Sequence, residues 1–152
     1  MRRPVSFSLY FFPTLLCSIA IYACSARQLE YTLVEDHDGN VAIPLKEVNN
    51  GDVHFYTYKH NGTNINFLVR MDGNGSLHTH FDACFTCFKF KKGYTVEGTE
   101  IICRECRTKF PLKEQRWINI GGCVPIDLGS EIIGDALVIK KEKIIKGEHF
   151  FK

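Results

Sequence analysis

Four of the seven cysteines form the clearest chemical pattern in the sequence. They fall into two Cys-x-x-Cys pairs, Cys84 with Cys87 and Cys103 with Cys106, and fifteen residues separate the pairs. Each pair can close a tight turn that directs two sulfurs at one ion, and a strand-turn-strand segment between them would bring the turns together. The spacing therefore predicts a metal site with four thiolate ligands.

The spacing does not identify the metal, because zinc and iron both accept four thiolates in a tetrahedron. In a structural zinc ribbon the ion would replace part of the hydrophobic core of a binding module. An iron or iron–sulfur centre would instead carry electrons. In a third interpretation the pairs cycle as disulfides, although a thiol oxidoreductase needs only one such pair, usually at the start of a helix. Here both pairs flank β-like sequence.

A fifth cysteine outside the N-terminal region, Cys123, follows Gly121 and Gly122, which permit close approach of the backbone. We expect Cys123 to complete or tune the metal site. A redox-active thiol and a buried small residue are the alternatives for this position.

Residues 77–82 lead directly into the first cysteine pair. If they form a strand, His78, His80 and Asp82 share a face with Cys84, because side chains alternate along a strand. A histidine or carboxylate on this face could support or replace a metal ligand. We expect instead that both histidines are solvated, and that Asp82 accepts hydrogen bonds from backbone amides of the turn.

The N-terminal segment, residues 1–23, has the pattern of an export signal, with Arg2 and Arg3 before an uncharged apolar run. Cys24 then occupies the position of the lipid-bearing cysteine of a lipoprotein. An uncleaved membrane anchor is the alternative. Both interpretations place residues 24–152, the predicted domain, outside the cytoplasm in the cell envelope.

The formal net charge is +2, and it becomes zero without the N-terminal arginine pair, so the composition gives no indication of nucleic-acid binding. Charge is nevertheless uneven along the chain. Between residues 84 and 116 there are four Glu and eight basic residues: Lys89, Lys91, Lys92, Arg104, Arg107, Lys109, Lys113 and Arg116. Such cations can stabilise a negative thiolate site or attract an acidic partner, although a solvated face is the commoner reason for them.

The remaining sequence predicts a mainly β, small antiparallel domain with a metal-binding hairpin of the zinc-ribbon or Rieske type. Alternating apolar residues around Asn61-Gly62 predict a hairpin. We expect residues 41–48 to form a strand interrupted by Pro44. Residues 88–91 are expected to form a strand of the metal-binding hairpin, and residues 132–140 a single late strand.

Over about residues 30–150, the chain resembles the FtrD-like family of membrane-associated iron–sulfur proteins. The matching residues are Phe81-Asp82-Ala83-Cys84, Cys87, Lys92-Gly93-Tyr94, Gly98, Cys103, Cys106, Phe110, Gly121-Gly122-Cys123, Pro125 and Leu128. The departures are His78, His80 and Val124. The element order is also distantly similar to a Rieske domain, with cysteines where Rieske centres use histidines, which implies a lower potential.

The resemblance implies that Cys84, Cys87, Cys103 and Cys106 bind an iron–sulfur cluster or iron, with Cys123 closely associated. It also implies a link to iron transport, with a permease or a redox protein as the partner. The protein would be attached to the membrane through a lipid or an N-terminal helix. The sequence contains no recognisable acid/base pair. We therefore expect a redox or metal-binding protein that is not an enzyme.

Overall fold

The computed structural model describes residues 29–113, 117, 119 and 121–152. The predicted signal segment, residues 1–23, and Cys24 lie outside the described residues. Strands dominate the described part, which also contains short helical segments. In chain order the elements are β1 (Thr32–Val34), β2 (Asn40–Pro44), α1 (Leu45–Val48), β3 (His54–His60), β4 (Thr63–Met71), β5 (Leu77–Cys84), η1 (Phe88–Phe90), β6 (Tyr94–Glu97), β7 (Glu100–Cys103), β8 (Lys109–Pro111), β9 (Pro125–Asp127), β10 (Glu131–Ile133), β11 (Ala136–Lys140), α2 (Lys141–Lys146) and η2 (Glu148–Phe150).

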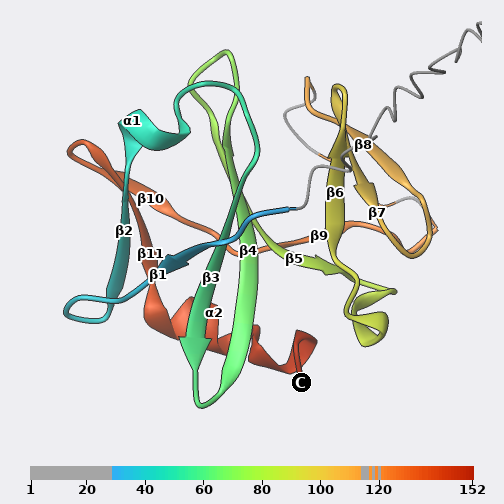
Figure 1. The fold of residues 1–152 in the computed structure, drawn as a ribbon. Helices are drawn as coiled ribbons and strands as arrows, with labels where there is room; N and C mark the ends of the chain where they lie inside the picture. Colours follow the sequence, from blue (N-terminus) through green and yellow to red (C-terminus); the bar gives the residue numbers. More distant parts are fainter. Residues whose placement is uncertain (1–28, 114–116, 118, 120) are drawn as a thin grey trace, which may run out of the picture.

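Three sheets form three layers (Figure 1). The central sheet has the order β1-β3-β4-β5-β9, the sheet on one side β10-β11-β2, and the sheet on the other side β6-β7-β8. We call the last one the small sheet. Most strand pairs are antiparallel, as predicted, but β1 pairs with β3 in parallel. The mainly β prediction is confirmed.

The β3–β4 hairpin turns at Asn61 and Gly62, as the sequence predicts. Both residues have positive φ, 46° and 81°, which a two-residue hairpin turn of type I′ requires. The hairpin pairs His60 with Thr63 across the turn and continues to His54 opposite Val69. Local turn chemistry therefore sets the register between β3 and β4.

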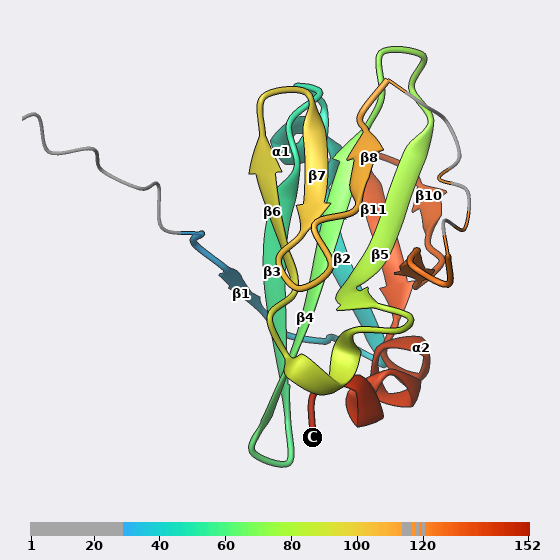
Figure 2. The ribbon, with the colours of Figure 1, turned by 90° about the vertical axis from the view of Figure 1, so that its right-hand side faces the viewer.

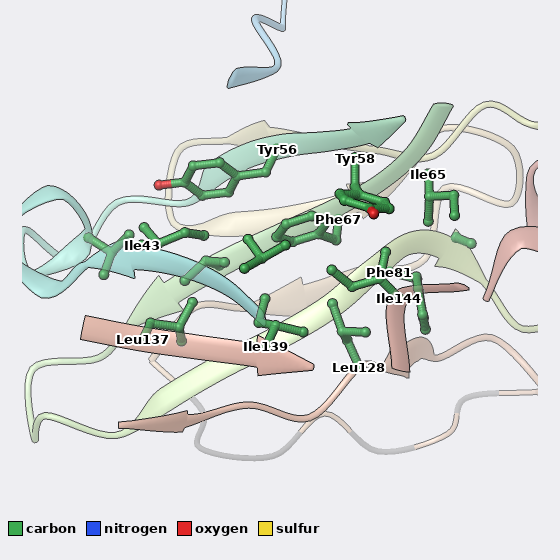
Figure 3. Packing of buried hydrophobic residues seen from close by; sticks show 14 residues of the cluster. Ile43, Tyr56, Tyr58, Ile65, Phe67, Phe81, Leu128, Leu137, Ile139 and Ile144 are labelled. Carbon is green, nitrogen blue, oxygen red and sulfur yellow. The ribbon is translucent and has the colours of Figure 1, made fainter. Parts of the chain in front are cut away.

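The central sheet is buried on both faces because each outer sheet covers one of them. Along β4, Ile65, Phe67 and Val69 pack against the sheet that contains β2 and β11, as Figure 3 shows for two of these residues. Leu68 points the other way, into the core under the small sheet. The two cores are separate clusters, and only the second contains cysteines.

The small sheet lies across the face of the central sheet (Figure 2). Its buried side chains include Tyr94, Ile101 and Phe110. Trp117 packs beside Phe110, with ring centroids 5.9 Å apart, and its indole N–H donates to the Pro111 carbonyl at 2.9 Å. Trp117 therefore packs against the core under the small sheet.

Three predicted strands differ from the structure. Pro44 ends β2 and residues 45–48 form the short helix α1, because Leu45 and Val48 pack into the first core. Residues 88–90 form the 3₁₀ turn η1, since Phe88 packs against Phe150 with ring centroids 5.3 Å apart. The expected late strand is a hairpin, β10–β11, which turns at Gly134 with φ of 63°.

Candidate metal centre

Two turns from different sheets carry the paired cysteines. Cys84 ends β5 of the central sheet, and the Cys87 amide donates to the Cys84 carbonyl at 3.0 Å. Cys103 ends β7 of the small sheet, and the Arg107 amide donates to the Cys103 carbonyl at 2.9 Å. Each hydrogen bond closes its turn, so the second cysteine of the pair, Cys87 or Cys106, folds back toward the first.

The four sulfurs converge on one point. The Sγ atoms of Cys84, Cys87, Cys103 and Cys106 all lie within 4.8 Å of one another. Four sulfurs at tetrahedral Zn–S or Fe–S bond lengths are about 3.8 Å apart, so this arrangement suits one ion with little movement. In the part of the chain that the structure describes, no other group of Cys, His, Asp or Glu side chains is placed to share a metal.

The four ligand candidates differ in exposure. Cys84 and Cys103, at the strand ends, retain only 2% and 1% of their accessible surface. Cys87 is partly exposed and Cys106 is exposed. The site therefore has a buried side against the second core and an open side at Cys106.

Cys123 lies beside the four sulfurs. Its Sγ is 3.1 Å from the Cys106 Sγ and 3.3 Å from the Thr86 hydroxyl oxygen. The Phe85 amide binds the Val124 carbonyl at 3.0 Å, which fixes the Cys123 segment against the first turn. The structure thus brings the fifth cysteine to the site.

Close approach of this segment depends on Gly122, which has φ of 87°. A Cβ atom there would lie 2.7 Å from the Thr86 methyl carbon. A side chain at this position would therefore push the segment away from the first turn. This agrees with the close approach predicted at Gly122, whereas a Cβ atom at Gly121 would have no neighbouring atom within 4 Å.

Thr86 is a site residue that the cysteine pattern did not single out. Its hydroxyl lies 3.8 Å from Cys84 Sγ, 3.7 Å from Cys87 Sγ and 3.3 Å from Cys123 Sγ. Thr108 has a similar position near Cys106, with its hydroxyl oxygen 3.2 Å from the sulfur. A hydroxyl inside or just after a Cys-x-x-Cys turn is the signal that marks both residues.

Asp82 connects the first turn to the small sheet. Its carboxyl group is buried and accepts hydrogen bonds from the Tyr94 amide at 2.7 Å and the Tyr31 hydroxyl at 2.6 Å. Burial raises the pKa of Asp82, although both hydrogen bonds oppose the effect. The carboxyl group therefore caps the start of β6, and not the amides of its own turn as predicted.

The Tyr94 side chain lies between the two turns. Its hydroxyl is buried and makes no hydrogen bond of regular geometry within the described residues. It is nevertheless close enough to the Cys84 sulfur to help lower the pKa of that thiol. Asp82 thus fixes the backbone of a residue whose hydroxyl faces a ligand sulfur.

Burial opposes the ionisation of all four ligand thiols. Burial acts to raise the pKa of Cys106, but hydrogen bonds, first of all with Thr108, lower it to about 6. Burial also opposes ionisation of Cys84, yet hydrogen bonds lower its pKa. Burial raises the pKa of Cys103 to about 11 and also raises the pKa of Cys87. A shared cation would remove this opposition, because metals bind the thiolate form.

The two histidines of β5 lie elsewhere. His80 packs on Trp117 with ring centroids 4.8 Å apart, and His78 binds Asp72 with 3.1 Å between nitrogen and oxygen. Burial, His78 and Arg70 lower the pKa of His80 to about 4. Both histidines are partly buried, so the expected solvated face is wrong, and neither belongs to the cysteine group.

Residues 48–151 match the family described as membrane iron-sulfur containing protein FtrD-like. The chain belongs to the FtrD-like family. The predicted resemblance is confirmed, and the match includes all five cysteines of the site. No curated protein and no solved structure matches the chain.

The family is one of membrane-associated iron–sulfur proteins. Within the described residues, no helix of this FtrD-like chain combines the length and apolar character needed to cross a membrane. The family assignment and the cysteine cluster together indicate metal binding.

Proposed function

We propose that this protein holds iron, as an iron–sulfur cluster or a single ion, and passes electrons in the cell envelope. Cys84, Cys87, Cys103 and Cys106 bind the metal, and Cys123 tunes or completes the site. The observation that carries the proposal is the convergence of four sulfurs within 4.8 Å in a chain of an iron–sulfur family.

The chemistry of the donors is compatible with iron. Four thiolates are soft ligands that suit iron or zinc and disfavour magnesium or calcium. The sulfurs as arranged suit one ion, and a cluster with sulfide between its irons would need them to separate. When bound, iron would supply a reversible one-electron change. The surrounding residues contribute the hydroxyls of Thr86 and Tyr94 and the hydrogen bonds that hold both turns.

Exposure of the site supports electron transfer. Cys106 is exposed, so a redox partner can approach one ligand directly, whereas Cys84 and Cys103 face the core. Within this proposal the protein is an accessory component of iron transport, and its partner is a permease or a redox protein. Residues 1–23 serve as a signal or anchor, and Cys24 carries the lipid if the signal is cleaved.

The test is metal analysis of anaerobically purified full-length protein, combined with a visible absorption spectrum. Iron with acid-labile sulfide indicates a cluster, and iron without sulfide indicates a single ion. Colourless protein with one zinc per chain would contradict electron transfer. The protein would then be a binding module in which zinc stabilises a ribbon-like hairpin.

Single substitutions test the ligands. Cys84→Ser and Cys106→Ser should each abolish metal binding, because three thiolates no longer close the coordination shell. Ala42→Ser, which introduces the same side chain at an exposed position of β2, is the control and should leave the metal content unchanged. If Cys84→Ser or Cys106→Ser retains full metal content, that ligand assignment is wrong.

One observation favours a second function, thiol–disulfide exchange. Cys106 is exposed, its pKa is lowered to about 6, and its sulfur lies 3.1 Å from that of Cys123. A low thiol pKa increases the thiolate fraction at neutral pH, and the thiolate is the nucleophile in exchange. Metal-free protein whose count of free thiols falls by two on mixing with a disulfide, and recovers with dithiothreitol, would support this function.

A further inference from the structure

Ion pairs cancel part of the positive charge around the metal centre. Three basic residues between positions 84 and 113 pair with glutamates: Lys92 with Glu105 at 2.6 Å, Arg107 with Glu97 at 3.2 Å and Lys109 with Glu100 at 3.0 Å. Four other cations in this range form no ion pair within the described residues: Lys89, Lys91, Arg104 and Lys113.

Three of these four cations lie in the segments that carry the ligands. Lys89 and Lys91 belong to η1 and the residue after it, which directly follow Cys87. Arg104 lies between Cys103 and Cys106, and all three side chains are exposed. The uncancelled charge is therefore concentrated at the two turns, where the thiolates themselves are negative.

The same segments expose two large apolar side chains. Phe85, between Cys84 and Cys87, is 58% exposed, and Phe90 is 49% exposed. The ammonium group of Lys89 lies 5.2 Å from the centroid of the Phe90 ring. Cations that only compensated a thiolate charge would need no exposed aromatic neighbours, whereas an aromatic centre with a charged rim is typical of protein interfaces.

We infer that residues 85–92 together with Arg104 form the docking face for an acidic protein partner. At this face an electron would pass between the iron and the partner's redox group, and this part of the inference rests on the proposed function. A protein partner fits better than a lipid surface, because electron exchange requires a redox group to approach the exposed ligand Cys106, and lipid carries no such group. The unpaired cations supply the charge complementarity that steers an acidic protein to this face.

The test uses the full-length chain loaded with zinc, so that binding is measured without any redox chemistry. An acidic [2Fe–2S] ferredoxin is the probe, titrated at low salt. The double variant Lys89→Glu/Lys91→Glu should bind about tenfold more weakly, because each charge at an interface rim changes affinity severalfold. Phe90→Ser should also weaken binding, and added salt should weaken binding of the unmodified chain.

The control is Lys46→Glu/Lys140→Glu, which changes the net charge by the same amount. These exposed lysines lie on α1 and at the end of β11, on the other side of the central sheet (Figure 1). The control should bind the ferredoxin as the unmodified chain does. Zinc content, measured for every variant, should remain one per chain.

Three outcomes would overturn the inference. The first is that the unmodified chain fails to bind the acidic ferredoxin. The second is that the two double variants bind the ferredoxin equally well. The third is that charge reversal at Lys89 and Lys91 reduces binding to phosphatidylglycerol vesicles and leaves ferredoxin binding unchanged. The last result would assign the face to the membrane. Failure of the proposed function is a separate result, because it appears as absence of iron in the purified protein.

Discussion

Replacing Gly93 by alanine tests how the buried carboxyl group of Asp82 holds the metal site together. A Cβ atom at Gly93 would lie 2.3 to 2.6 Å from the carboxyl atoms of Asp82. Asp82 is 5% exposed and is held in place by hydrogen bonds from the Tyr31 hydroxyl and the Tyr94 amide. Either the hydrogen bond from the Tyr94 amide breaks, or the start of β6 moves.

Two contributions determine how much free energy of unfolding the Gly93→Ala variant should lose. Gly93 has φ of 64°, and an alanine in that left-handed region costs about 1–2 kcal/mol. Loss of a partner for a buried polar group adds about 1–3 kcal/mol. The Gly93→Ala variant should therefore lose about 2–5 kcal/mol of its free energy of unfolding, a large part of the total of a domain this size.

Gly98→Ala is the matched control. Gly98 has nearly the same φ, 60°, but a Cβ atom placed there would have no neighbouring atom within 4 Å. It should lose only the backbone term of about 1–2 kcal/mol. Urea unfolding of both variants, monitored by circular dichroism, measures the difference.

The effect should reach the metal. The Gly93 carbonyl accepts a hydrogen bond from the Arg104 amide at 3.0 Å, so movement at Gly93 displaces the second turn. Zinc affinity of Gly93→Ala, measured by competition with a chelating dye, should fall, whereas that of Gly98→Ala should not. Equal stability losses in the two variants would refute the role given to Asp82.

Two further predictions concern acid stability and metal removal. The pKa of His80 is about 4 in the folded chain and 6.5 in the unfolded chain, so the unfolded state binds the extra proton between these values and stability falls as pH drops from 6.5 to 4. The loss in free energy of unfolding approaches about 3 kcal/mol. The His80→Phe variant keeps an aromatic ring against Trp117 and should lack this pH dependence. Urea titrations of metal-free protein between pH 6.5 and pH 4 measure it. A slope unchanged by the substitution would show that another group is responsible. Removal of the metal by a chelator should accelerate amide hydrogen exchange in residues 84–87 and 103–108. Exchange in β4 and β11 should stay slow, because the first core contains no cysteine. Exchange that rises equally in all these segments would contradict this prediction.

The sequence was sufficient where a local rule applies. The Asn61-Gly62 pair determined the β3–β4 hairpin, since few residue pairs accept two positive φ values. The two Cys-x-x-Cys pairs indicated sulfurs that would converge, and the structure brings them within 4.8 Å.

Tertiary contacts decided the remaining features. Alternation of Phe and Lys in residues 88–91 predicted a strand, but packing of Phe88 against Phe150, some sixty residues later, favours a tight turn. One partner of Asp82 is similarly remote, because Tyr31 is 51 residues away in the chain. Neither contact has a signal in the neighbouring sequence.

The unequal exposure of the ligands implies an order for metal exchange. Cys84 and Cys103 are held at the ends of strands and nearly closed to solvent, whereas Cys106 is open. A competing ligand can therefore approach the ion most directly from the Cys106 side. Cys106 should be the first sulfur to release an outgoing ion and the last to close around an incoming one.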